Sequence, residues 1–462
     1  MSLTIGIVLL GVAAADSTSS SPPAPAALDF EVEWEAAAAH PPPIPWDRSQ
    51  FPLPPELRPT VDFWKAVFSR HGEDQILLHD RDQPWRVYGV VDLVAEGDGV
   101  ALTGLARRRA LDHAADRIRR GLRRVAQADD PSALEGDEAR LAALFAGASR
   151  SELKAAPERL HLQRGIREKF AYALEKSGRF LPGILAVLRE QGVPQTLAAL
   201  PFIESSFQVE AHSSARAVGL WQLMAATVRG SLQIDDAVDE RRDPFLSTAA
   251  AAAVLRGNYE ALGSWPLAVV AYNYGLNGMK RAVRRFGNQD FLRILREHDG
   301  RAFGYAGRNF YPEFLAALEL YGERSGAFPE VVPERPENPR RFVVQDYVPL
   351  PALSLALGLS RDQIREYNPA LLPSVLEGRR FVPAGYQLHL PPDYSWDAGR
   401  LYASMPEEAR HGRQKHNTYT VQRGDTLARI AARFSTTVAE LARINDLRRI
   451  HVIHPGQRLI VE

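Results

Sequence analysis

Glu204 ends an apolar run in the stretch LAALPFIESSF, residues 197–207. A carboxylic acid that donates a proton at neutral pH needs a raised pKa, and burial against an apolar wall supplies that shift. The wall predicted here consists of Leu197, Leu200, Phe202 and Ile203. The alternative is an ordinary acid at a helix end, solvated or bonded to Ser205 or Ser206, and the fragment alone favours that interpretation.

Two further motifs change that balance. Gly219-Leu220-Trp221-Gln222 follows Glu204, and the sequence AYNYG occupies residues 271–275. Alone they would be interpreted as a glycine turn with a core tryptophan and as an aromatic helix end. In this order and spacing, E-S, G-L-x-Q and A-Y-N-x-G resemble the family 1 lytic transglycosylases over about residues 165–325. The resemblance implies a goose-lysozyme-like helical domain that cleaves the glycan strands of peptidoglycan.

The resemblance also implies roles for single residues. Glu204 would be the general acid and then the base of the reaction, and Ser213 would contact the acetamido group of the substrate. Gln222 would line the cleft. Tyr272 and Asn273 would lie close to the acid and to the sugar at the reaction centre. These five residues are therefore the predicted site.

Glu204 has no partner acid in these motifs, although most glycosidases use two carboxylates. Glu210, Asp235 and Asp236 are nearest in sequence, and we expect them to be solvated loop charges. The resemblance implies that the substrate supplies the missing groups. Glu204 would cleave the β-1,4 bond between MurNAc and GlcNAc, the 2-acetamido group would stabilise the cationic centre, and the 6-hydroxyl would close a 1,6-anhydro-MurNAc ring.

One segment departs from the family pattern. Relatives carry E-T-x-x-Y-V near the end of the domain, whereas this chain has Ala306 and Phe310 in place of the acid and the tyrosine. We expect Tyr311 to compensate in part for the missing tyrosine. We therefore assign no catalytic role to residues 306–311, and the change motivates the alternative of an inactive scaffold.

The C-terminal part reads as two repeats. Residues 417–462 predict a strand, two helices and a strand, and the sequence YTVQRGDTLARIAARFSTTVAELARIN resembles LysM modules, which bind N-acetylglucosamine-containing glycans. Residues 340–392 follow the same order but carry Asp346-Tyr347-Val348 in place of the Gly-Asp-Thr turn. The sequence therefore leaves open whether this degenerate LysM-like module binds glycan. A polar linker, 393–416, separates the two.

The elements that must position the site are mainly α-helical. We expect the catalytic domain at residues 155–330, with Pro182 beginning a helix that stops at Gly192. Residues 61–154 predict a helical N-terminal extension, because Leu111, Ala115, Ile118, Leu122 and Val125 form one apolar stripe. We expect the arginines between these apolar positions to form the solvated face of the helix. Residues 16–60, rich in Pro, Ser and Ala, predict a linker or extended lead-in.

The composition excludes several classes of protein. The formal net charge is zero, so nothing points to nucleic acid or to an anionic membrane as partner. The absence of cysteine excludes disulfides, thiolate catalysis and a lipid anchor on cysteine. The histidines lack ligand spacing, so we expect no metal and no cofactor. No segment after the N-terminus is apolar enough to form a transmembrane helix.

The N-terminus predicts export. Residues 3–12 are apolar, and the alanines at 13–15 fit a cleavage site, so residues 1–15 are a predicted signal peptide although no Lys or Arg precedes the run. A ragged apolar leader is the alternative. We expect a location in the periplasm or cell envelope, where peptidoglycan glycan strands are the partner.

Three functions compete at this stage: a lytic transglycosylase, a hydrolytic muramidase acting on the same bond, and an inactive peptidoglycan-binding scaffold. The mass of the released muropeptides separates the two enzymes, because hydrolysis adds water. Loss of lysis in Glu204→Gln, with binding to sacculi unchanged, would exclude the scaffold.

Overall fold

The computed structural model describes residues 41–461 except 98, 287–289, 301, 337–339, 416–417, 446 and 448–452. The predicted signal peptide at 1–15 lies outside the described residues. The chain forms two compact units. The first runs to Leu232 and resumes at Pro244, and the second takes Gln233–Asp243 and the chain from Asn338 onward. A short segment in the middle of the sequence thus belongs to the second unit.

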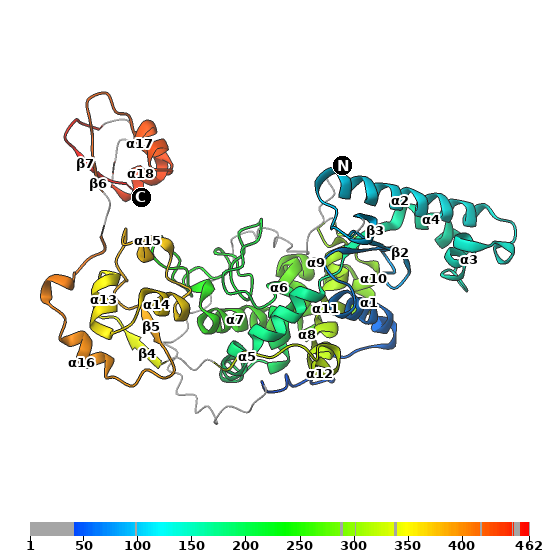
Figure 1. The fold of residues 1–462 in the computed structure, drawn as a ribbon, viewed down its shortest axis with the longest axis horizontal. Helices are drawn as coiled ribbons and strands as arrows, with labels where there is room; N and C mark the ends of the chain where they lie inside the picture. The colour runs from blue at the N-terminus through cyan, green and yellow to red at the C-terminus, as the bar shows by residue number, and fades with distance from the viewer. Residues whose placement is uncertain are drawn as a thin grey trace. The chain divides into compact units, whose positions relative to one another are not determined.

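The first unit contains most of the helices and a small sheet (Figure 1). In chain order its elements are α1 (Arg58–Ser69), β1 (Gln75–Asp80), β2 (Val87–Asp92), α2 (Gly104–Gln127), α3 (Gly136–Ala143), α4 (Arg150–Arg159), β3 (Leu160–Arg164), α5 (Arg167–Glu190), α6 (Leu200–Glu204), α7 (Pro244–Leu262), α8 (Trp265–Tyr274), α9 (Leu276–Phe286), α10 (Phe291–Glu297), α11 (Gly304–Gly322) and α12 (Arg324–Ala327).

Helix α8 lies at the centre of this unit. Its residues from Trp265 to Tyr272 are all buried, as expected of a helix that is apolar on every side. It packs against α7, α9 and α11. Helix α7 contributes the run of buried alanines 249–252, whose small side chains let neighbouring helices approach closely. This core confirms the prediction of a mainly helical domain.

Helix α5 corrects one prediction. It starts at Arg167 and runs straight through Pro182, which we had expected to begin a helix. A proline inside a helix loses one backbone hydrogen bond and costs about 3 kcal/mol. Burial offsets that cost, because the residues around it, including Leu181 and Ile184, are fully buried. The end of the helix before Gly192 agrees with the sequence.

The N-terminal extension is not purely helical, which is a second correction. Strands β1, β2 and β3 form an antiparallel sheet in the order β2-β1-β3, with Leu78 opposite Gly89 on one side and Leu162 on the other. The central strand is the short run QILLHD, and a short apolar run does not distinguish a strand from a helix by periodicity. The sheet closes only when β3 arrives from more than 60 residues later in the chain.

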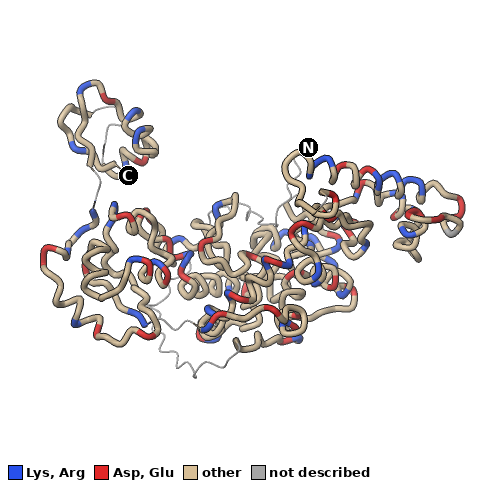
Figure 2. Tube along the Cα trace, in the orientation of Figure 1, with Lys and Arg blue, Asp and Glu red and all other residues tan. Residues whose placement is uncertain are grey.

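Helices α2, α3 and α4 form an arm that extends from this sheet (Figure 1). The stripe predicted on α2 is buried, from Leu111 to Val125. Figure 2 shows basic residues recurring along α2, on turns between the buried positions. The arginine-rich face is therefore largely exposed, as the amphipathic pattern indicated.

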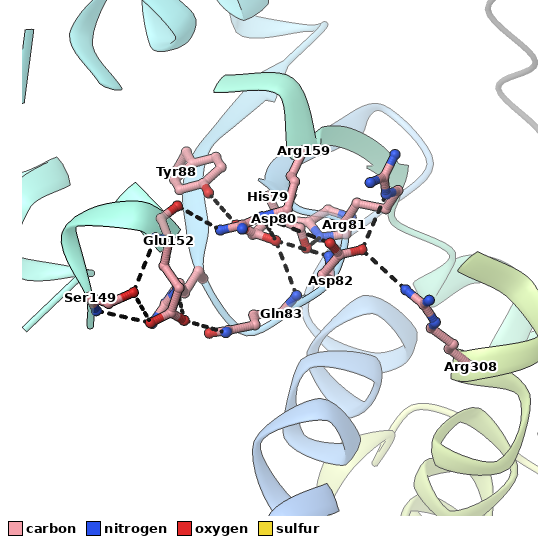
Figure 3. Close-up of polar contacts among 11 residues, drawn as sticks. His79, Asp80, Arg81, Asp82, Gln83, Tyr88, Ser149, Glu152, Arg159 and Arg308 are labelled. Atoms are coloured by element: carbon pink, nitrogen blue, oxygen red, sulfur yellow. Dashed lines mark hydrogen bonds and ion pairs between the residues drawn. The ribbon is translucent and has the colours of Figure 1, made fainter. Parts of the chain in front are cut away.

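A buried carboxylate holds the sheet to the arm. Asp80 is fully buried, and Arg159 contacts it through Nε and Nη2 at 2.8–3.1 Å (Figure 3). The Tyr88 hydroxyl donates to it at 2.9 Å, and the backbone N–H groups of Asp82 and Gln83 donate at 2.9 and 3.2 Å. These bonds join β1, β2 and the end of α4. Removing one partner of such a buried pair costs about 3–5 kcal/mol.

The extension packs against α11. Trp64 of α1 donates a 2.8 Å hydrogen bond to the side chain of Asn309, and both residues are buried. Arg308 reaches Asp82 in the loop between β1 and β2 at 3.3 Å (Figure 3). Residues 58–164 therefore brace the helix that closes the catalytic domain.

The described part of the lead-in is bound to the first unit rather than free. Phe51 is fully buried and packs against Trp265 and Phe314, with ring centroids 6.0 and 5.6 Å apart. The hydroxyls of Tyr311 and Tyr321 donate to the carbonyls of Pro52 and Pro42. The expectation of a linker is wrong for residues 41–57, because its few apolar side chains find places in the helical core.

The second unit contains two modules with separate cores. The first comprises β4 (Arg340–Val343), α13 (Leu350–Leu357), α14 (Arg361–Tyr367), α15 (Pro373–Leu376) and β5 (Gln387–Leu390), followed by α16 (Ala398–Ala403). The second comprises β6 (Thr418–Thr420), α17 (Leu427–Arg433), α18 (Val438–Ile444) and β7 (Arg458–Ile460). In each module the two strands pair antiparallel.

One asparagine network appears in both modules. Asn368 donates to the carbonyls of Ile364 and His389 and accepts from the His389 N–H. Asn445 makes the same three bonds, to the carbonyl four residues before it and to both backbone groups of Ile460. Each asparagine thus ties the second helix of the βααβ pattern to the last strand. This shared bonding supports the internal repeat read from the sequence, with α15 as an addition in the first module.

Two features are absent from the described residues. None of the helices there combines the length and the apolar character needed to cross a bilayer. No group of three or more His, Asp or Glu side chains in that part of the chain is arranged to hold a metal ion.

Candidate active site

Glu204 is the last residue of the short helix α6, which follows a 3-10 turn at Gln195–Ala199. The preceding apolar residues form a buried wall, with Leu197 and Leu200 fully inaccessible and Phe202 nearly so. The Glu204 side chain sits at the edge of this wall and is half-buried. Of the predicted wall residues, Ile203 is also half-buried. The local sequence therefore places an acid where apolar packing meets accessible surface.

The backbone turns sharply after Glu204. Ser206 and Phe207 have φ of +52° and +56°, a region that residues with a side chain rarely adopt. The Phe207 ring packs against Phe202 at 4.6 Å, and the Ser205 hydroxyl donates to the Leu220 carbonyl at 2.9 Å. Packing and a buried hydrogen bond thus hold a strained turn directly beside the acid, a pattern that clusters at functional sites.

The second motif forms a tight turn. Gly219 has φ of +83° and Gln222 has φ of +46°. The Gln222 side-chain amide donates to the carbonyls of Gly219 and Ala211 at 2.8 and 3.3 Å. Its carbonyl oxygen is buried and has no hydrogen-bond partner within the described residues. Gln222 thus has one free acceptor at the site.

The third motif ends α8. The Tyr272 hydroxyl donates to the Trp221 carbonyl at 2.7 Å, which ties α8 to the turn of the second motif. Asn273 is half-buried, and its amide makes no hydrogen bond within the described part of the chain. Gly275 follows with φ of +91°, where a side chain would be strained, and ends the helix.

The turn Gly219–Gln222 is the junction of the three motifs. Its Leu220 carbonyl accepts from Ser205, and its Trp221 carbonyl accepts from Tyr272. Ser213 lies on the same loop, where its hydroxyl accepts from the Ala217 N–H at 2.9 Å. No direct bond links Ser213 to the other four predicted residues in the described structure. Hydrogen bonds thus join the segments that carry Glu204, Gln222 and Tyr272 at one turn, and Asn273 follows Tyr272 in the chain. Ser213 lies apart on the loop.

The electrostatics of the site centre on two acids. Burial, and after it the carboxylate of Glu313 on α11, together raise the pKa of Glu204 to about 8. Burial also raises the pKa of Glu313 to about 8. The pKa of Tyr272 is raised well above its usual value by burial and by Glu204. Glu204 and Tyr272 are therefore close enough to interact, and a second acid acts on the first.

Sequence reasoning missed Glu313. It lies outside the three motifs, and we had considered only acids that are near Glu204 in the chain. A signal existed, because Glu313 interrupts the apolar sequence of α11 between buried Pro312 and Phe314. Glu210, by contrast, is exposed as predicted. Asp235 and Asp236 belong to the other unit.

The segment 306–311 has a packing role. Asn309 accepts from Trp64, and the Tyr311 hydroxyl donates to the Pro52 carbonyl. Phe310 and Tyr311 are buried. The residues on either side of the substituted Phe310 therefore bind the N-terminal extension and the lead-in.

Two family models match parts of the chain. Residues 184–294 match the transglycosylase SLT domain, and residues 419–462 match the LysM domain. The first range includes all five predicted site residues, whereas Glu313 lies beyond its end. The chain thus carries a transglycosylase SLT domain followed by a C-terminal LysM domain.

Among curated proteins, the chain is similar to membrane-bound lytic murein transglycosylase D of Escherichia coli (strain K12), at 27% identity over 289 residues. The match covers 60% of this chain and 62% of that protein. A shorter match, 34% identical over 119 residues, covers 25% of this chain and 58% of a protein of Alteromonas sp. (strain M-1) named for tributyltin chloride resistance. The chain therefore spans less than two thirds of the length of these relatives.

A solved structure is also similar, that of an inactive mutant of the lytic transglycosylase Slt from Pseudomonas aeruginosa. The sequences are 20% identical, and the match covers 47% of this chain and 34% of that chain, with a TM-score of 0.28. A likeness of this size adds nothing to the two family matches.

Proposed function

We propose that the protein is a peptidoglycan lytic transglycosylase that cleaves the β-1,4 bond between MurNAc and GlcNAc and forms 1,6-anhydro-MurNAc. The observation that carries this proposal is the half-buried Glu204, whose pKa of about 8 keeps it protonated at neutral pH, within a transglycosylase SLT domain. An acid with this pKa is suited to donate a proton and to take one back.

The proposed reaction uses one protein acid and two groups of the substrate. Glu204 donates its proton to the glycosidic oxygen as the bond from C1 of MurNAc breaks. The 2-acetamido oxygen stabilises the positive charge at C1. The 6-hydroxyl oxygen then bonds to C1 and gives its proton to Glu204, so the acid is restored and no water is consumed.

The other predicted residues would bind the sugar. The unpartnered amide of Asn273 and the free carbonyl oxygen of Gln222 offer a donor and acceptors for acetamido and hydroxyl groups. The Ser213 hydroxyl keeps a proton to donate, because it acts as acceptor toward Ala217. The Tyr272 hydroxyl donates to Trp221, so its oxygen can accept the Glu204 proton as a hydrogen bond.

The LysM domain supports binding of glycan strands, and the module before it is proposed to share the fold. Glycan strands of peptidoglycan are the proposed partner, and neither a cofactor nor a metal takes part in the proposed reaction. Since that substrate lies outside the cytoplasmic membrane, we propose that the protein is exported to the periplasm or cell envelope.

Digestion of purified sacculi, with mass analysis of the released muropeptides, tests this function. We expect products with the mass of anhydro-muropeptides, and no release by Glu204→Gln. Glu210→Gln is the matched control, because Glu210 is an exposed acid six residues away and should leave release unchanged. Products heavier by one water would instead identify a hydrolytic muramidase.

The scaffold alternative has its own outcome in the same experiment. If wild type and Glu204→Gln both bind sacculi and neither releases muropeptides, the protein is a binding scaffold and the proposed function is wrong. The raised pKa of Glu204 favours the enzyme, because strongly perturbed pKa values cluster at the acids and bases of active sites.

A further inference from the structure

Glu313 lies on α11, outside the matched SLT range, and nothing in the three sequence motifs points to it. Helix α11 packs against α6, which carries Glu204. The Phe202 and Tyr321 rings, 5.5 Å apart, fix this contact. Glu313 is half-buried, like Glu204. The two acids thus sit on two helices that are packed together, each with part of its side chain accessible.

Neither acid has a partner of its own. Within the described residues, neither carboxyl group of Glu204 and Glu313 forms a hydrogen bond or an ion pair. A structural acid on α11 looks different: Glu319 pairs with Arg58 at 2.8 Å and with Lys65 at 3.2 Å. Buried acids without partners are costly, so their retention points to function rather than to stability.

The cations around α11 are engaged elsewhere. Arg58 and Lys65 of α1 bind Glu319, and Arg308 binds Asp82. The titratable groups that interact with the pair are the two tyrosines Tyr272 of α8 and Tyr305 of α11. Both hydroxyls are neutral at physiological pH, because burial raises their pKa values well above the usual range. No positive charge in the described structure therefore offsets the repulsion between the two acids.

The position of Glu313 is also related to that of Ala306, where this chain lacks the acid of the family motif. The two positions are seven residues apart, about two helical turns, and so lie on one face of α11. The acid missing from the family motif thus has a counterpart further along the same face.

We propose that Glu313 is the second carboxylate of the active site and acts as a positioning residue: the two acids share a poorly solvated site, so that ionisation of one carboxyl group holds the proton on the other until a glycan binds. This role rests on the proposed function. Like charges held close together in a poorly solvated site disfavour the second ionisation, so one proton stays on the pair. Once Glu204 has given up its proton, the same repulsion makes it a stronger base toward the 6-hydroxyl.

The pH dependence of muropeptide release tests this role. Glu313→Gln removes the charge but keeps the shape, so the alkaline limb should move to lower pH by about one unit or more. Glu313→Asp keeps the charge and should restore the limb toward its wild-type position. Glu319→Gln, on the same helix, is the control and should leave the limb in place. An alkaline limb unchanged in Glu313→Gln overturns the proposal.

A second measurement does not need activity. A carboxyl group whose pKa is raised by folding costs stability as pH rises from about 4.5 through 8, and costs nothing below 4.5. We expect Glu204→Gln and Glu313→Gln each to raise the unfolding midpoint at pH 9 relative to pH 4. The double variant should gain less than the two single gains together, because either change relieves the repulsion. Additive gains at pH 9 overturn the proposal even if the protein proves to release no muropeptides.

One further outcome would reassign Glu313. If the products carry an added water and Glu313→Gln is inactive at every pH, Glu313 activates water as a base. That result contradicts both the positioning role and the lytic transglycosylase function. Anhydro products with an unchanged alkaline limb contradict the positioning role alone.

Discussion

The Tyr272 hydroxyl donates a 2.7 Å hydrogen bond to the backbone carbonyl oxygen of Trp221. This bond crosses from the end of α8 to the glycine turn, and the next carbonyl back, that of Leu220, accepts from Ser205 beside the acid. Three segments that are far apart in the sequence are therefore held in register by two hydrogen bonds to one turn. The site depends on backbone carbonyl acceptors, which cannot be predicted from a pattern of residue types.

Loss of the Tyr272 hydroxyl should cost both stability and activity. Tyr272→Phe leaves the buried Trp221 carbonyl without its donor, which costs about 1–3 kcal/mol. We expect a lower free energy of unfolding in denaturant titrations and slower muropeptide release. Tyr274→Phe is the matched control on the same helix, because its hydroxyl contacts His298 rather than the turn. Equal activity in the two variants would contradict a role for Tyr272 at the site.

Asn273 should affect activity without affecting stability. Its amide makes no bond within the described residues, so Asn273→Ala should change the free energy of unfolding by about 0.5 kcal/mol or less. If the amide binds substrate, release of muropeptides should slow markedly. Asn258→Ala gives the contrast, because its buried amide donates to the Ala268 carbonyl and its loss should destabilise the fold. A variant Asn273→Ala with wild-type release would remove Asn273 from the site.

Activity should fall as pH rises through about 8. Glu204 must be protonated to donate, and with its pKa raised to about 8 the acid form predominates below that pH and declines above it. An unburied glutamate would have lost its proton above about pH 4.3. The initial rate of muropeptide release between pH 5 and 10 checks this. A profile that already declines between pH 5 and 6 would contradict the assignment of Glu204 as the acid.

The segment Gln233–Asp243 should depend on residues after 337. Ala237 and Val238 are buried in the core of the first C-terminal module. The Asp239 N–H donates to the Ala370 carbonyl, the Leu372 N–H donates to the Ala237 carbonyl, and Asp236 pairs with Arg380. A chain that ends at residue 337 exposes these groups. We expect it to unfold at a lower temperature and to be cut by protease within 233–243, as mass analysis of the fragments would show.

A chain that ends at residue 415 is the control for this truncation. It keeps the first module and removes only the last one, whose core is separate. We expect its segment 233–243 to resist protease as in the full chain. Equal protease resistance of the chain that ends at 337 would show that the segment does not need the module.

The sequence determined much of this protein by itself. Short motifs in a fixed order and spacing singled out Glu204 and its neighbours as the predicted site. The periodic stripe of α2 and the βααβ order of the last module were also readable, since amphipathic periodicity and turn residues act locally.

Only the tertiary structure decided the rest, because it depended on contacts between residues far apart in the chain. Helix α5 continues past Pro182 because the residues around the proline are buried. Strand β1 is part of a sheet because it pairs with the distant strand β3. The lead-in is ordered around Phe51 because the helical core offers a place for its ring. Glu313 acts on the pKa of Glu204 because α11 packs against α6, and an electrostatic interaction between two helices has no signature in the residue spacing of either.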